Sequence, residues 1–151
     1  MNNKFTQHFY TIMFLLFLYN LTSCKTENVN GIIINDTLLT NQSYIENKKL
    51  KKIIEKCLDN DPKGFIELNK FNCGSGAGCY DLGYVLTQIV YKIGEENFLN
   101  TINKFEKKTQ RQLSSLLRVG LEYGDNDYDN KQDNRKLNTE FPKIFELTEK
   151  Q

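Results

Sequence analysis

The chain has 151 residues, with 20 basic and 19 acidic side chains, one histidine and no tryptophan. This length suits one domain, and the absence of a basic excess argues against nucleic-acid binding, which needs a positive footprint. Its histidine, His8, lies near the N-terminus. Ser-His-Asp catalysis, Cys-His catalysis and histidine-bearing zinc sites are therefore excluded for the rest of the chain, and we expect neither an enzyme nor a cofactor.

The N-terminal segment combines a lysine, a short apolar run and small residues. The run from Phe9 to Leu21 covers 13 residues, whereas a membrane-spanning helix needs roughly 20. This arrangement is typical of a secretory signal peptide, here residues 1–23.

Leu21-Thr22-Ser23-Cys24 resembles the lipobox of bacterial lipoproteins, in which an aliphatic and two small residues precede a cysteine. The resemblance implies that the Cys24 sulfur takes a diacylglyceryl group, and that the chain is cut before Cys24 and acylated at the new amine. Removal of residues 1–23 leaves no formal net charge. The alternative is an ordinary secreted protein cut after Cys24.

The lipobox also implies a location. Two or three acyl chains anchor a protein durably without spanning the bilayer, so we expect the cell envelope, on the periplasmic or surface-exposed side. Lys25, rather than an aspartate, follows the cysteine. This does not suggest retention at the inner membrane and favours the outer one.

Residues 25–42 are polar apart from Ile32 to Ile34 and Leu38-Leu39. We expect residues 24–42 to form a lipidated tether, in which the isoleucines pack on the domain as a short extended piece. Residues 43–151 then form the single domain.

Beyond residue 43, apolar residues recur at helical spacing. The predicted helices are 43–58, a short one after Asp61-Pro62, 82–93 with Asp81 as N-cap, 95–107, one opened by a Thr109–Gln112 capping box, and 139–150. With no convincing strand pair, the fold class is all-α: a compact bundle of about five to six antiparallel amphipathic helices, comparable to a small HEAT-like array. Gly120 in an apolar stripe indicates close approach of another helix.

The cysteines predict one disulfide. Cys73 and Cys79 bracket Gly-Ser-Gly-Ala-Gly, export implies an oxidising compartment, and glycines let the sulfurs meet. Cys57 lies on an apolar helical stripe, which favours a buried free thiol. The alternatives are a reduced Cys73 and Cys79 pair, and pairing of Cys57 with Cys73 or Cys79.

Tyr80, Asp81 and Tyr84 follow this loop and are aromatic and charged residues of the kind that interfaces favour. A disulfide-closed loop beside them indicates a surface presented to a partner. Phosphate binding at the glycines is less favoured, because Cys79 occupies the last glycine position of G-x-G-x-x-G.

Four acidic residues have the spacing of positions one, three, five and nine of a calcium loop: Asp125, Asp127, Asp129 and Asp133. Asn130 replaces the turn glycine and Lys136 replaces the bidentate glutamate. A solvated loop is therefore favoured over a weak calcium site.

Small lipoproteins with a compact α domain, no histidine and a disulfide-closed loop are similar in style to immunity-type lipoproteins. The likeness implies a lipid-anchored envelope binding protein, an immunity or inhibitor protein whose partner is a toxin or hydrolase. The alternatives are a structural or envelope-assembly lipoprotein and a carboxylate-based hydrolase.

Overall fold

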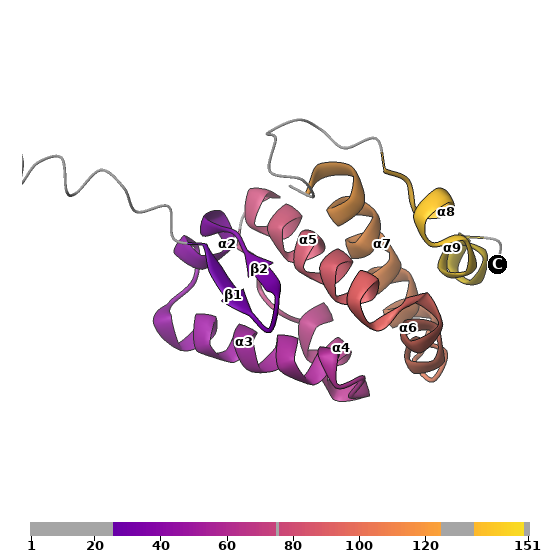
Figure 1. The fold of residues 1–151 in the computed structure, drawn as a ribbon, viewed down its shortest axis with the longest axis horizontal. Helices are drawn as coiled ribbons and strands as arrows, with labels where there is room; N and C mark the ends of the chain where they lie inside the picture. Colours follow the sequence, from indigo (N-terminus) through magenta and orange to yellow (C-terminus); the bar gives the residue numbers. More distant parts are fainter. Residues whose placement is uncertain (1–25, 75, 125–134, 150–151) are drawn as a thin grey trace, which may run out of the picture.

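The structure, a computed structural model, describes residues 26–74, 76–124 and 135–149 (Figure 1). The fold is compact and mainly helical, which confirms the predicted class. Its elements in chain order are β1 (Glu27–Val29), β2 (Ile32–Ile34), α2 (Asp36–Thr40), α3 (Tyr44–Leu58), α4 (Pro62–Asn69), α5 (Gly76–Ile93), α6 (Glu95–Ile102), α7 (Lys107–Tyr123), α8 (Leu137–Glu140) and α9 (Pro142–Glu149).

The strand pair was not predicted. Strands β1 and β2 are antiparallel, with Val29 opposite Ile32 at the turn. The turn residues Asn30 and Gly31 have φ angles of 50° and 85°, and two positive φ angles are what a type I′ hairpin turn requires. The Asn-Gly pair between apolar residues is a hairpin signal that the sequence analysis overlooked.

The predicted tether is wrong for residues 27–40, because this segment belongs to the fold. Ile34 and Leu38 have no exposed surface. The side chain of Gln88 holds β2 in place: its Nε2 donates to the Ile33 carbonyl at 2.8 Å and its Oε1 accepts from the Ile33 N–H at 2.9 Å. The isoleucines do pack as an extended piece, and Lys25 and Thr26 alone separate Cys24 from β1.

Local capping explains the starts of α3 and α4. The Ser43 side chain accepts a hydrogen bond from the Glu46 N–H, and Asp61 accepts one from Lys63 with Pro62 in the first helical turn. These contacts satisfy N–H groups that a helix start leaves unpaired, and both predicted starts are confirmed.

Four other helix boundaries were predicted wrongly. Helix α6 ends at Ile102 and not at residue 107. Helix α5 begins at Gly76, so Asp81 lies inside it, and α7 begins at Lys107 after Glu106, so Thr109 is not its N-cap. The final helix is divided into α8 and α9 at Phe141, whose φ and ψ are −136° and 69°. Phe141 precedes Pro142, and a residue before proline avoids the helical region.

Helix α5 is the centre of the fold, with α7 on one side and β2, α2 and α3 on the other (Figure 1). A Cβ atom at Gly120 would lie 2.1 Å from the Gly83 carbonyl oxygen, so the predicted close approach at Gly120 is confirmed. Phe65 of α4 meets Phe98 of α6 edge to face, with ring centres 5.3 Å apart. The HEAT-like arrangement stays a prediction.

Candidate protein-binding site

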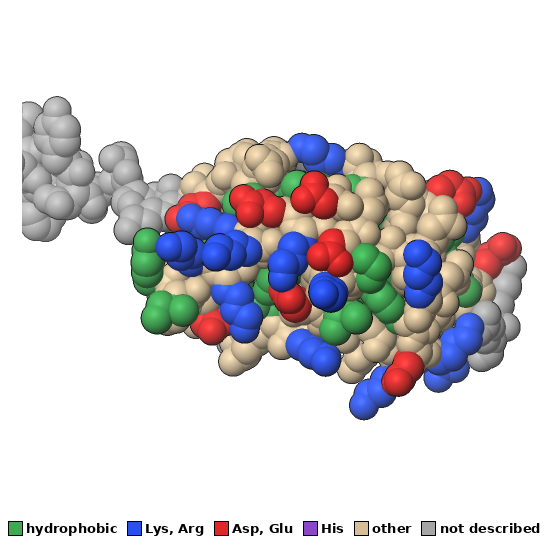
Figure 2. All heavy atoms as spheres, turned by 90° about the horizontal axis from the view of Figure 1, so that it is seen from below, with side chains coloured by type: hydrophobic (Ala, Val, Ile, Leu, Met, Phe, Trp, Pro, Cys, Tyr) green, Lys and Arg blue, Asp and Glu red, His purple; other side chains and the backbone are tan. Residues whose placement is uncertain are grey.

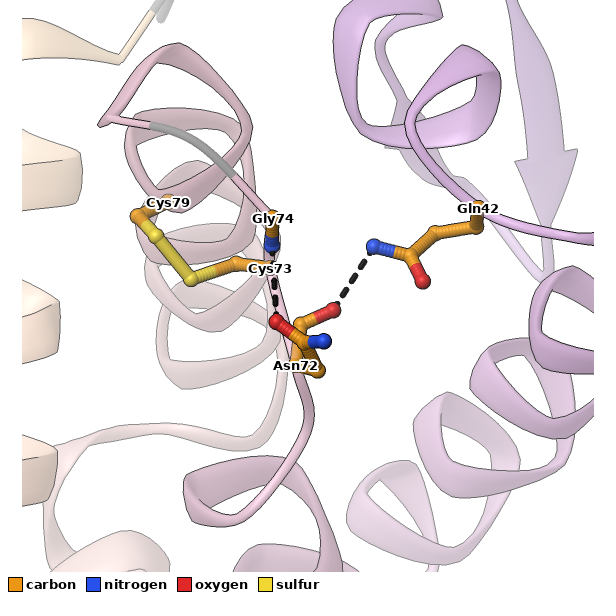
Figure 3. Close-up of a disulfide and its surroundings, with 5 residues drawn as sticks. All are labelled: Gln42, Asn72, Cys73, Gly74 and Cys79. Atoms are coloured by element: carbon orange, nitrogen blue, oxygen red, sulfur yellow. Dashed lines mark hydrogen bonds between the residues drawn. A yellow bond between two sulfur atoms is a disulfide. The ribbon is translucent and has the colours of Figure 1, made fainter.

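The predicted disulfide joins Cys73 to Cys79, with Cα atoms 4.9 Å apart (Figure 3). It connects the segment after α4 to the first turns of α5. A Cβ atom at Gly78 would lie 2.3 Å from the Cys73 carbonyl oxygen. The glycine at this position therefore lets the two ends of the loop come together.

Hydrogen bonds tie this loop to the rest of the domain (Figure 3). The Asn72 side-chain oxygen accepts from the Gly74 N–H at 3.0 Å, and the Asn72 carbonyl accepts from the Gln42 side chain at 2.7 Å. Gly74 has a φ of 77°, a conformation that glycine adopts without strain. The loop is thus held on both sides, by the disulfide and by the α2–α3 connection.

Beside the disulfide lies a groove between the end of α4, the start of α5 and one face of α7. It has a volume of about 380 Å³. We call it the disulfide groove, and its apolar walls come mainly from Phe71, Cys73, Cys79, Tyr80, Leu116 and Val119. Partly open apolar grooves of this kind are typical places for a partner's apolar side chain to bind.

A second cavity, of about 560 Å³, continues from the groove. Asn69 and Gln112 line both, and the Asn69 side chain donates to the Gln112 side-chain oxygen at 3.0 Å. The second cavity carries three lysines and one glutamate: Lys70, Lys104, Lys108 and Glu106. This lysine cavity gives one end of the site a positive charge.

Tyr80 is the predicted partner residue that the structure places at the groove. Its side chain is 43% exposed and stacks on Tyr123, with ring centres 5.2 Å apart and an angle of 22° between the rings. Tyr123 is 50% exposed. The pair forms a flat aromatic surface at the rim.

Tyr84 and Asp81 do not join this surface. The prediction of Tyr84 as a partner contact is wrong, and that of Asp81 stays a prediction. Tyr84 is buried, with 3% of its surface exposed, and it packs near the end of α7, where a Cβ atom at Gly124 would lie 2.8 Å from the Tyr84 Cβ. The Asp81 carboxylate accepts from the Leu38 N–H at 3.0 Å and from the Asn35 side chain at 3.2 Å. Asp81 therefore caps α2, a different helix from its own.

Cys57 is a fully buried free thiol, as predicted. Burial raises its pKa, and the nearby carboxylates of Asp61 and Glu67 act in the same direction. A thiol held in the protonated form is a poor nucleophile, so Cys57 serves as a core residue.

The predicted lipidation and calcium sites are not among the described residues of the disulfide groove. Within residues 26–74, 76–124 and 135–149, no three His, Cys, Asp or Glu side chains form a group that could hold a metal ion. Cys24 and the calcium-loop aspartates, Asp125, Asp127, Asp129 and Asp133, lie outside the described residues. The lipidation and calcium predictions stay predictions.

The sequence analysis missed Leu116, Val119 and Tyr123 as site residues. They recur at i, i+3 and i+7 and form a second apolar stripe beside the buried one of α7. A helix that packs on one side needs one such stripe. The apolar surface of α7 is wider than one packing face requires, and this pattern could have indicated the groove from the sequence.

Comparisons with protein-family models, with curated proteins and with solved structures gave no significant match. No helix in the described part of the chain has both the length and the apolar character to cross a bilayer.

Proposed function

We propose that this chain is a lipid-anchored binding protein of the bacterial cell envelope, and that it acts as an immunity or inhibitor protein on a toxin or hydrolase. The observation that carries the proposal is the disulfide groove with the stacked Tyr80–Tyr123 pair at its rim. The lipobox resemblance at Cys24 supports the anchor.

The groove has the features of a preformed binding surface. The disulfide and the Asn72 hydrogen bonds fix one wall before a partner arrives, which lowers the conformational entropy lost on binding. Tyrosine is enriched among residues that dominate interface energies, since it offers a large rigid area and a hydroxyl.

The lysine cavity indicates the chemistry of the partner. Lys70, Lys104 and Lys108 outnumber Glu106 there, and complementary charge speeds association and sets orientation. We expect the partner to insert an apolar side chain into the groove and to place acidic residues opposite the lysines.

Affinity capture tests this function. The mature protein with its disulfide intact would be incubated with the secreted and envelope proteins of its own organism. One stoichiometric partner is expected, and its identity distinguishes a toxin or hydrolase from an envelope-assembly component.

Variants connect the capture to the groove. Val119→Glu places a charge in the groove and should abolish capture, while Tyr80→Ala should weaken it roughly tenfold or more, the loss typical of an interface hot spot. Tyr91→Ala is the matched control, because Tyr91 is 43% exposed, as Tyr80 is, and does not line the groove. Equal capture by all variants would contradict the groove, and no capture by the unmodified protein would contradict the binding function.

A further inference from the structure

Two apolar side chains stand exposed at the start of α3. Tyr44 is 81% exposed and Ile45 is 75% exposed, the highest values among the large hydrophobic side chains of the described residues. Single exposed apolar residues are ordinary on protein surfaces, but these two are adjacent, and the core lies on the other side of the helix at Leu50 and Ile54.

Lysines continue the same side of α3. Lys48 and Lys52 follow Tyr44 at i+4 and i+8, and Lys49 follows Ile45 at i+4. The three lysines therefore lie on the same face of α3 as the two exposed apolar side chains. Lys49 pairs with Glu46 at 3.7 Å, with both side chains partly exposed to solvent. Figure 2 shows basic side chains gathered toward the end of the molecule at which the described chain begins.

This face lies at the end of the domain where the described chain begins (Figure 1). The starts of β1 and α3 are at the same end of the fold (Figure 1), and Lys51 of α3 forms an ion pair with Glu27 of β1 at 2.5 Å. Between Cys24 and Glu27 stand Lys25 and Thr26. A chain advances at most about 3.6 Å per residue, so Cys24 lies within about 11 Å of the first residue of β1.

We infer that the start of α3 is a second membrane contact: Tyr44 and Ile45 enter the interfacial layer of the bilayer, and Lys48, Lys49 and Lys52 bind anionic headgroups. The inference rests on the proposed lipid anchor at Cys24. An anchor this close to the fold keeps the domain against the bilayer, and the face beside it has the chemistry of an interfacial site. Tyrosine favours the headgroup level, and lysines are attracted to anionic lipid.

The absence of tryptophan gives a direct test. The full chain, purified in its processed form with a Tyr44→Trp substitution, would be reconstituted into vesicles of phosphatidylglycerol and phosphatidylcholine in equal parts. We expect its emission to shift to shorter wavelength and to be quenched by brominated lipid. The Tyr123→Trp variant is the matched control and should show neither change, because Tyr123 lies at the disulfide groove.

Neutralising two lysines tests the charge contribution. In the Tyr44→Trp background, Lys48→Gln with Lys52→Gln should lower the ratio of docked to undocked protein about 25-fold, because each lysine near an anionic surface contributes roughly a factor of five. High salt should act in the same direction.

Flotation with the vesicles separates this inference from the anchor itself. If the chain floats while the Tyr44→Trp indole stays in water, the docking is contradicted and the lipid anchor is supported. A protein would then be the partner of this face. A chain that neither floats nor carries acyl mass on Cys24, with no shift of its indole emission, overturns both. Loss of the shift in the lysine variant, with unchanged flotation, supports the docking.

Discussion

Gly83 and Gly120 bring helices α5 and α7 together backbone to backbone. A Cβ atom at Gly120 would lie 2.1 Å from the Gly83 carbonyl oxygen, and one at Gly83 would lie 2.7 Å from the Gly120 nitrogen. The same carbonyl accepts a hydrogen bond from the Thr87 hydroxyl at 3.0 Å. The central helix pair of the fold therefore depends on two residues without side chains.

Gly120→Ala should lower the free energy of unfolding by about 3 kcal/mol, because the methyl group meets backbone that cannot move aside without separating the helices. Urea unfolding followed by circular dichroism measures this. Gly76→Ala is the control: its added Cβ meets no atom within 4 Å, and alanine in a helix is neutral or slightly stabilising. Similar losses in both variants would refute the packing argument.

Removing the disulfide by Cys73→Ser with Cys79→Ser should reduce the free energy of unfolding by about 2 kcal/mol, since a closure of this short separation restricts the unfolded chain modestly. The midpoint of urea unfolding would be compared with and without a reducing agent. Reduction should lower the midpoint of the unmodified protein and leave that of the double variant unchanged. A double variant as stable as the unmodified protein would contradict this expectation.

Asp81→Asn should cost about 1 to 2 kcal/mol of stability. The charged carboxylate accepts two hydrogen bonds at the start of α2, and loss of a helix cap typically has this size. Hydrogen exchange of the α2 amides should also accelerate. Asp59→Asn, at an exposed acid, is the comparison and should change stability by less than about 0.5 kcal/mol. Unchanged exchange in α2 would show that Asp81 does not cap it.

Cys57 should make stability depend on alkaline pH. Burial raises the pKa of its thiol above the ordinary value of 9.0, so the folded protein keeps a proton that the unfolded chain loses. Its contribution to stability is therefore complete below about pH 9 and declines as the pH rises above that value.

The measurement is the difference between the unfolding free energies of the unmodified protein and of Cys57→Ala, taken from neutral to alkaline pH. The difference isolates Cys57 from Tyr91, whose pKa is also raised, chiefly by burial. We expect the advantage of the unmodified protein to shrink above about pH 9. A constant difference would mean that Cys57 ionises as readily in the folded protein as in the unfolded chain.

Several features could be read from neighbouring residues. The starts of α3 and α4 follow from Ser43 and from Asp61-Pro62, and the disulfide follows from two cysteines close in sequence around glycines. The hairpin was also readable, because Asn30-Gly31 encodes its turn without help from the rest of the fold.

By itself the sequence determined the helical class, the buried stripes, the short closure at Cys73 and Cys79 and the close approach at Gly120. The first three features depend on residues that lie close together in the sequence. The close approach depends on Gly120 having no side chain. The tertiary structure alone decided that Asp81 caps α2 from 43 residues away, that Tyr84 is buried, and that Tyr80 meets Tyr123 above a groove. The physical reason is that such contacts join segments far apart in the chain, and their geometry exists only once α5 has packed against its neighbours.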